Sequence, residues 1–270
     1  MTIALTGPST PTATAGPARA GFRQAVAAEW TKLFTLRSTK WILAITAVGT
    51  LLVTFLSAQS TTHKSHMWYQ GFDPTNQSLA GLSIGALSLG TLGVLIISGE
   101  YSTGTIRSSL AALGRRDSLF MAKLAVLSAV TLVLGEVLSF GAFFLGQAIL
   151  SGGGAPTASL GQPGVLRAVV LTGAFLSLFA LLGFGLGLMI RHTAGALATF
   201  AGVTLLAPIL LKTIGGHPVR FTPAGIFANS VAAVVPQSNQ LSATIGFMLM
   251  VLYCTGVLVA GSVLLAKRDA

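Results

Sequence analysis

The chain has 270 residues, of which 53% are hydrophobic and only 8% charged, and its mean hydropathy is +0.81. Soluble domains carry about 25% charged residues, so this composition excludes a water-soluble globular protein and indicates an integral membrane protein. The net charge of +10 does not call for a nucleic-acid partner, because membrane proteins collect Lys and Arg on their cytoplasmic side.

The N-terminal region divides into two parts. Residues 1–20 are rich in Pro, Thr, Ala and Gly, lack the pattern of a signal peptide, and are expected to form a disordered cytoplasmic tail. Residues 21–40 are expected to form an interfacial amphipathic helix, because four apolar residues share an arc of about 80°: Phe22, Val26, Trp30 and Leu33. Glu29 lies near the edge of this stripe, and we expect it to pair with an arginine of the first cytoplasmic loop.

Six apolar segments are long enough to cross the hydrocarbon layer, which takes about 20 helical residues. They are Trp41–Ala58, Leu79–Ser98, Ala122–Ile149, Ala168–Ile190, Ala194–Leu211 and Leu241–Ala266. The third and sixth are longer than a bilayer needs, so we expect them to tilt or project beyond it. The fifth is short and carries Pro208 near its far end. The sequence thus predicts an all-α integral membrane protein with a six-span transmembrane domain over residues 41–270.

The basic residues predict the orientation of the spans. With the N-terminus in the cytoplasm, the inner side holds twelve of them: Arg19, Arg23, Lys32, Arg37, Lys40, Arg107, Arg115, Arg116, Lys123, Arg191, Lys267 and Arg268. The outer side holds four: Lys64, Arg167, Lys212 and Arg220. This positive-inside bias predicts a multi-pass protein of the cell membrane with both termini in the cytoplasm.

The first cytoplasmic loop, residues 99–117, concentrates polar residues between two apolar spans. Ser102 or Thr103 can cap the start of a short helix there and Gly114 can cap its end. Three apolar residues would share one face of that helix: Ile106, Leu110 and Leu113. We therefore expect an amphipathic helix over residues 103–113, which serves either as a docking surface or as a linker whose arginines hold lipid phosphates.

The stretch GEYSTGTIRSSLAALGRRDSLFMAKL, residues 99–124, resembles a segment of type-2 ABC transporter permeases. In that family a Glu, a Thr-Gly-Thr triplet and a downstream Arg precede the third span, and the segment forms a coupling helix that inserts into a cleft of the cytoplasmic ATPase subunit. The matching residues here are Glu100, Thr103, Gly104, Thr105, Arg115 or Arg116, and Lys123. The resemblance implies ATPase coupling for this segment, in which we also expect Arg107 to take part. One departure is that many relatives carry Pro near the end of this helix, where this chain has LAALGRR.

A second stretch, AAEWTKLFTLRSTKW at residues 27–41, is similar to the N-terminal segment of actinobacterial members of the same family. There the segment forms a helix on the membrane surface, to which Glu29, Trp30 and Lys32 would belong. A simple interfacial anchor is a compatible interpretation. Together the two stretches imply a permease subunit that pairs with a second permease chain, in a homodimer or heterodimer, and with two copies of an ABC ATPase subunit.

The resemblance also implies that ATP and Mg bind to the partner subunit, that this chain has no cofactor of its own, and that it is not an enzyme. The chain contains no Gly-x-x-x-x-Gly-Lys-Ser/Thr motif, so a separate polypeptide would have to bind the nucleotide. Export is the expected direction because the family consists largely of exporters. The weakly charged spans favour a hydrophobic or amphipathic cargo.

Glu136 is the only acidic residue in the interior of a predicted span, where a charge costs about 2.5–3.5 kcal/mol. It is a candidate for the translocation pathway, and the alternative is a structural hydrogen bond, for example with Ser139. Gln147, near the outer end of the same span, is a weaker candidate for the pathway.

Three glycine patterns inside the spans are typical of close helix packing: GLSIG (81–85), GTLG (90–93) and GFGLG (183–187). The outer segment 215–240 is broken by Pro223 and Pro236 but too apolar for an ordinary loop. It is expected to form a re-entrant or surface-lying hairpin, and permeases of the family resemble it in placing short outer helices before the last span. The pair His63 and His66 lacks a third ligand, so no metal site is predicted.

Two other functions fit part of the sequence. An ion-coupled secondary transporter would need several ionisable groups near the midplane, where only Glu136 qualifies. A non-transport, ABC-like membrane sensor would share every feature described above. An intramembrane metalloenzyme is disfavoured because no His-Glu-x-x-His motif occurs, and Cys254, the only cysteine, excludes an intramolecular disulfide.

Overall fold

The computed structural model describes residues 21–62, 71–104, 116–215, 217–233 and 241–268. Every regular element among them is a helix, and six helices are long and apolar enough to cross a membrane. The expected all-α architecture with six potential membrane spans is therefore confirmed. The predicted tail, the pair His63 and His66, and most of the first cytoplasmic loop lie outside the described residues.

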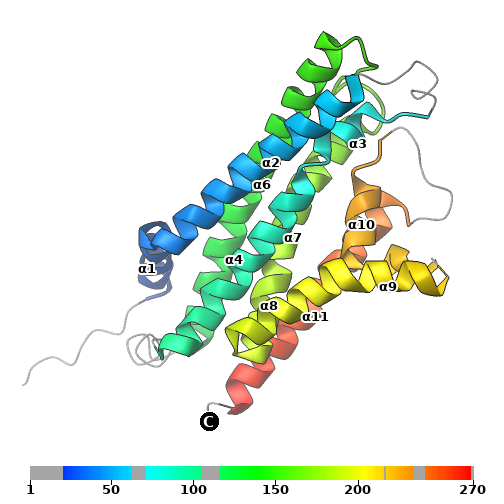
Figure 1. Cartoon of the computed structure of the whole chain (residues 1–270). Coiled ribbons are helices and arrows are strands. Elements are labelled where there is room, and N and C mark those ends of the chain that lie inside the picture. Colours follow the sequence, from blue (N-terminus) through cyan, green and yellow to red (C-terminus); the bar gives the residue numbers. More distant parts are fainter. Residues whose placement is uncertain (1–20, 63–70, 105–115, 216, 234–240, 269–270) are drawn as a thin grey trace, which may run out of the picture.

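The helices follow one another along an elongated bundle (Figure 1). Their bounds are α1 (Phe22–Thr35), α2 (Arg37–Thr62), α3 (Pro74–Leu79), α4 (Leu82–Thr103), α6 (Arg116–Gly152), α7 (Val165–Ile190), α8 (Thr193–Ala201), η2 (Gly202–Leu206), α9 (Ala207–Ile214), η3 (His217–Phe221), α10 (Pro223–Ser230) and α11 (Ala243–Arg268). The six potential spans are α2, α3 with α4, α6, α7, α8 through α9, and α11.

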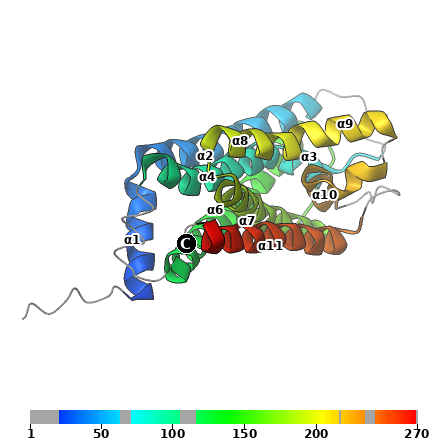
Figure 2. The same ribbon diagram turned by 90° about the horizontal axis from the view of Figure 1, so that it is seen from below.

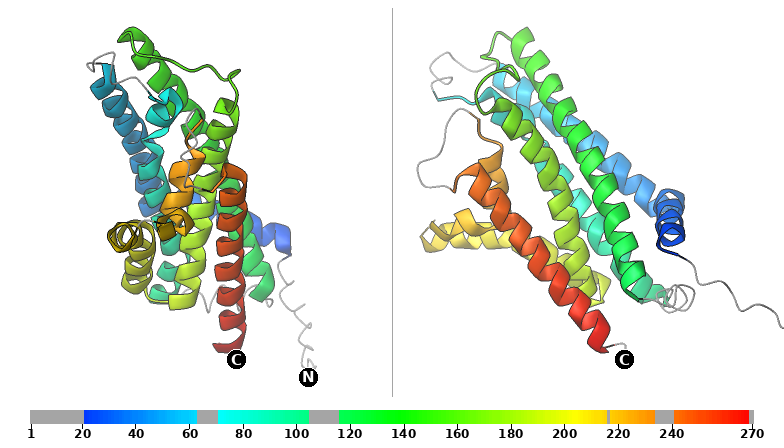
Figure 3. Two further views of the ribbon diagram at one scale, coloured as in Figure 1. Left: turned by 90° about the vertical axis from the view of Figure 1, so that its right-hand side faces the viewer. Right: turned by 180° about the vertical axis from the view of Figure 1, so that it is seen from behind.

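Helix α1 lies across one end of the bundle, transverse to α2 (Figure 2). We call this the α1 end. The last turns of α4, α7 and α11 and the first turn of α6 also lie at this end (Figures 1 and 3). An even number of spans between α1 and the end of α11 accounts for this arrangement.

Helix α7 occupies the centre of the bundle and contacts α4, α6, α8, α10 and α11. Its approach to α4 depends on glycine: a Cβ on Gly93 would lie 1.9 Å from the carbonyl oxygen of Ala180, and one on Gly183 would lie 2.0 Å from that of Gly90. No side chain fits at such distances, so the two backbones touch directly. The expectation that GTLG and GFGLG serve helix packing is confirmed.

Helix α2 buries hydroxyl-bearing side chains and exposes apolar ones, which is the reverse of a helix in a soluble protein. Its buried face is mainly hydroxyl-bearing: Thr39, Thr46, Thr50, Thr54, Ala58 and Thr61. Six of its large apolar residues are exposed: Trp41, Ile45, Val48, Leu52, Phe55 and Leu56. Small threonine side chains let α2 approach Gly81, the residue before α4, where a Cβ would lie 2.1 Å from the carbonyl oxygen of Thr50. This pattern suits a helix whose outer face meets lipid tails.

The fifth potential span is not a uniform α-helix. Its α-helical parts, α8 and α9, are joined by the π-helical turn η2, and Pro208 lies in the first turn of α9. Proline lacks the N–H that a regular helix would use, and a π turn is one way to absorb that loss. Helix α9 diverges from the other spans (Figures 1 and 3), and its exposed residues include Ile209 and Leu210.

The described part of the segment 215–240, which precedes the last span, contains two short helices, η3 and α10. The ring of Phe227 in α10 meets Phe175 and Phe179 of α7 at centroid distances of 6.0 and 5.8 Å. Phe179 lies fourteen residues after Val165, about 21 Å along α7 at about 1.5 Å per residue. Helix α10 therefore packs at the level of the middle of α7.

Candidate functional site

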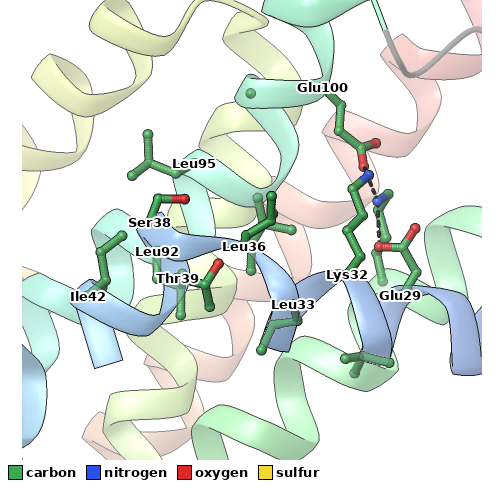
Figure 4. Close-up of a pocket in the computed structure, with 14 residues that line it drawn as sticks. Glu29, Lys32, Leu33, Leu36, Ser38, Thr39, Ile42, Leu92, Leu95 and Glu100 are labelled. Carbon is green, nitrogen blue, oxygen red and sulfur yellow. Dashed lines mark hydrogen bonds and ion pairs between the residues drawn. The ribbon is translucent and has the colours of Figure 1, made fainter. Parts of the chain in front are cut away.

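Four charged side chains meet at the α1 end, where α1, α4 and α6 come together. The ammonium of Lys123 lies at their centre, and its Nζ donates to Oε1 of Glu100 at 2.6 Å and to Oε2 of Glu29 at 2.7 Å. Lys32 of α1 and Glu100 of α4 point toward one another, and Lys32 Nζ donates to the same Oε1 (Figure 4). We call Glu29, Lys32, Glu100 and Lys123 the charge cluster.

The docking of α1 onto α6 brings Glu29 into the charge cluster. The two buried residues of α1, Ala25 and Leu33, lie four residues before and after Glu29, so all three share one helical face. Phe22, in the first turn of α1, and Trp30, at the edge of this face, remain exposed. The predicted apolar stripe is therefore divided, because Leu33 packs against protein whereas Phe22 and Trp30 do not.

Burial makes the innermost pair of the charge cluster the strongest. Lys123 and Glu100 are each 3% exposed, and removing one partner of such a pair costs about 3–5 kcal/mol because the other charge is left uncompensated. The side chain of Lys32 is 36% exposed, so its ion pair with Glu100 contributes only about 0–1 kcal/mol. The cluster thus holds α1 against the ends of two spans.

The structure places Glu100 in the last turn of α4 rather than in a loop. Helix α4 continues through Thr103 and ends at Gly104, which adopts the left-handed conformation with φ of 69°. The Ser102 hydroxyl donates to the carbonyl of Gly99 within the same helix. The expectation that Ser102 or Thr103 caps a new helix is therefore wrong, because the polar residues prolong the span until a glycine can end it.

The remaining positions implied for ATPase coupling are not described. The expected coupling helix, with Thr105, Arg107 and Arg115, lies outside the described residues, as do the side chains of Thr103 and Arg116. Glu29 has a described partner other than the expected arginine, namely Lys123, which belongs to α6. Sequence reasoning missed this pairing because Glu29 and Lys123 are 94 residues apart and belong to different stretches of the resemblance.

Arg191 adds a second junction at the α1 end that the sequence did not reveal. It ends α7 in the left-handed conformation with φ of 57°, which is unusual for a residue other than glycine. Its guanidinium lies 5.1 Å from the ring centroid of Tyr101 in α4 and donates to the carbonyl of Leu264 in α11 at 3.2 Å. Arg191 thereby links the ends of three spans.

Glu136 is half-buried at the contact between α6 and α7. A Cβ on Gly173 of α7 would lie 2.7 Å from its Cδ, so the missing side chain of that glycine makes room for the carboxyl group. No hydrogen bond or ion pair to the carboxyl group is present among the described residues. The Ser139 hydroxyl, considered above as a partner, instead donates to the carbonyl of Val169 at 2.6 Å.

Gln147 cross-links three segments at the end of the bundle opposite α1. Its amide Nε2 donates to the carbonyl of Pro74 at 3.1 Å and to the hydroxyl of Ser78 at 3.0 Å. Its Oε1 accepts from the backbone N–H of Ala158 at 2.7 Å. These bonds join α6 to α3 and to the segment that follows α6, so the geometry gives Gln147 a structural task.

The charge cluster also forms one side of a cavity of about 400 Å³ between the α1–α2 junction and α4 (Figure 4). Comparison with known proteins gives no further assignment of the site. No protein-family model matches the chain. No curated protein matches it either. The resemblance to type-2 permeases therefore rests on the two stretches quoted above, and the function that it implies is a proposal.

Proposed function

We propose that this chain is the membrane-spanning permease subunit of an ATP-driven ABC exporter. It would work with a second permease chain and with two copies of a separate ATPase subunit that binds ATP and Mg. The proposed cargo is a hydrophobic or amphipathic compound, and the proposed setting is the cell membrane with both termini in the cytoplasm.

The charge cluster is the observation that carries this proposal. Its members come from the two stretches that resemble permeases: Glu29 and Lys32 from residues 27–41, and Glu100 and Lys123 from residues 99–124. Two chance resemblances would have no reason to meet in space. Their contact through buried ion pairs supports a common origin and a common task.

The cluster also suggests how force would pass into the membrane domain. In the sequence, residues 105–115 connect α4, whose last turn contains Glu100, to α6, and α1 is held to both helices through Lys123. A push from an ATPase subunit on this connection would therefore move the three helices together. Because α4 touches α7 through glycine, the movement would reach the centre of the bundle and the contact that holds Glu136.

The proposal predicts a stable complex with an ATPase. The test is purification of the tagged full chain from its native membrane in gentle detergent, with mass spectrometry of the proteins that accompany it. We expect a near-stoichiometric ATPase that carries its own phosphate-binding loop. If none accompanies the chain under conditions that keep other transporter complexes intact, the proposal fails and a self-sufficient transporter that uses Glu136 takes its place.

Arg107→Ala makes the same experiment specific for the coupling loop. We expect recovery of the ATPase to fall about tenfold, as for loss of an arginine at an interface hot spot, with unchanged membrane insertion. Lys212→Ala is the matched control, because this exposed basic residue lies in α9, away from the α1 end. Equal recovery of the ATPase with both variants would contradict the coupling role.

A further inference from the structure

The cavity beside the charge cluster has the size and wall of a small-molecule site, for which volumes of about 300–1,000 Å³ are usual. Its apolar wall combines residues of α1, the α1–α2 junction and three spans: Leu33, Leu36, Ile42, Leu92, Leu95 and Val126. All four members of the charge cluster line it as well. The cavity is therefore amphipathic, with charge gathered at one side.

The cavity is charged near the helix ends and apolar toward the middle of the spans, as a membrane leaflet is polar at its surface and apolar in its interior. Glu100 lies in the last turn of α4, at the α1 end, and Leu92 lies eight residues earlier, about 12 Å deeper along the helix. The charged side is thus level with the helix ends, and the apolar side extends toward the middle of the spans. A phospholipid places its headgroup and its acyl chain in the same order, whereas a water-soluble metabolite has no such gradient.

Glu100 and Lys32 supply the groups that would select a headgroup. Oε1 of Glu100 accepts from two lysines, whereas its Oε2 is buried and has no hydrogen-bond partner among the described residues. Lys32 is the more exposed of these two lysines, and its ammonium is carried by a flexible side chain. An ammonium from outside can displace it from Glu100, and Lys32 is then free to meet a phosphate.

We propose that this cavity binds one aminophospholipid from the leaflet that contains α1. The acyl chain lies against Leu92 and Leu95, the primary ammonium donates to Glu100, and the phosphate accepts from Lys32. A primary ammonium has N–H donors for the carboxylate, whereas the trimethylated ammonium of a choline headgroup has none. The inference depends on the membrane setting alone and not on the proposed transport role.

Native mass spectrometry of the purified full chain in non-ionic detergent tests this assignment. The chain is titrated with phosphatidylethanolamine and with phosphatidylcholine of identical acyl chains, and the population with one bound lipid is measured. We expect one saturable site that prefers the ethanolamine lipid about tenfold, the usual order for a charge-assisted hydrogen bond. Equal affinity for both lipids, or adducts that do not saturate, would overturn the proposal.

Two tryptophan variants locate the acyl chain. Leu95→Trp fills the apolar part of the cavity and should remove the saturable adduct. Val133→Trp adds the same bulk on the lipid-facing side of α6, where Val133 is 66% exposed, and should leave the adduct unchanged. If the two variants bind the ethanolamine lipid equally well, the lipid is not in the cavity.

Two headgroup variants complete the test. Glu100→Gln should abolish the preference for ethanolamine over choline while retaining binding of the tail. If this variant does not fold, Lys32→Met provides an independent measurement. It should weaken the choline lipid, which loses the donor to its phosphate. It should not weaken a long-chain primary amine without phosphate, which no longer competes with Lys32 for Glu100. A Lys32→Met variant with unaltered phospholipid affinities would count against the proposed site.

Discussion

The ammonium of Lys123 donates a 2.6 Å hydrogen bond to the carboxylate of Glu100, and the two side chains are almost completely shielded from solvent. The residues belong to different spans, and the connection between these spans is the segment for which we propose ATPase docking. Each charge is stable at this depth only because the other is present. The pair therefore couples the stability of the α1 end to the geometry of the proposed docking segment.

Lys123→Met should destabilise the protein strongly. The substitution leaves Glu100 and Glu29 without their shared cation, and we expect a loss of about 3–5 kcal/mol. The loss of stability would be measured by heating the detergent-solubilised chain and quantifying the remaining folded protein by size-exclusion chromatography. Lys32→Met is the control and should change the stability by at most about 1 kcal/mol, because Lys32 is partly exposed.

A double variant separates the ion pair from simple loss of packing. Glu100→Gln combined with Lys123→Met removes both buried charges, so it should be milder than Lys123→Met alone. If the two substitutions are additive, the pair does not stabilise the α1 end in the way described here.

Gly93→Ala should disrupt the contact between α4 and α7. The added Cβ would lie 1.9 Å from a backbone oxygen of Ala180, so the helices would have to separate, and we expect a loss of at least about 1–3 kcal/mol. Gly256→Ala in α11 is the matched control, since a Cβ there meets nothing within 4 Å. We expect Gly93→Ala to have the lower melting temperature. Equal melting temperatures of the two variants would mean that the close approach of α4 and α7 is not structurally important.

Gln147→Leu should lower stability without a specific effect on transport. The variant leaves the buried backbone N–H of Ala158 without its acceptor, at a cost of about 1–3 kcal/mol. It also removes one donor each from the Pro74 carbonyl and the Ser78 hydroxyl, which still bond to each other. Protease sensitivity of the segment between α6 and α7, compared with that of Gln59→Leu on the exposed side of α2, would report the loss. Normal stability with altered transport would instead favour the pathway role expected from the sequence.

The sequence predicted the spans because hydropathy and helix length act locally. Four of the six predicted segments lie within the helical spans observed, and Leu79–Ser98 lies within the combined span of α3 and α4. The last, Leu241–Ala266, begins two residues before α11. The ends were less accurate, since α6 begins at Arg116 and α4 extends to Thr103. Polar residues continue a helix when buried partners satisfy them, and hydropathy alone carries no information about such partners.

The charge cluster could be predicted only in part. The resemblance selected Glu29, Lys32, Glu100 and Lys123 from two separate stretches, but no periodicity could show that they meet. Their contacts depend on how α1 crosses the bundle, which is set by the packing of Ala25 and Leu33. Arg191 was missed for the same reason, because nothing in the sequence brings it near Tyr101.

Glu136→Gln should change transport while leaving the fold intact. The carboxyl group lies over Gly173, with no ion pair among the described residues, so replacing it with an isosteric amide removes a titratable group and little packing. If Glu136 lines the pathway, cellular efflux should change about tenfold for at least one member of a panel of hydrophobic and amphipathic dyes, as expected for one lost polar contact. Yield and melting temperature should remain those of the parent chain.

Val137→Gln separates a pathway effect from a general effect of polarity in α6. Val137 is the next residue in the helix and faces outward, so its substitution places the same amide in contact with lipid. We expect Val137→Gln to reduce membrane insertion without altering efflux per inserted molecule, which is the opposite of Glu136→Gln. A Glu136→Gln variant that fails to accumulate would assign the carboxyl group to the architecture of the α6–α7 contact, because a pathway residue is dispensable for folding.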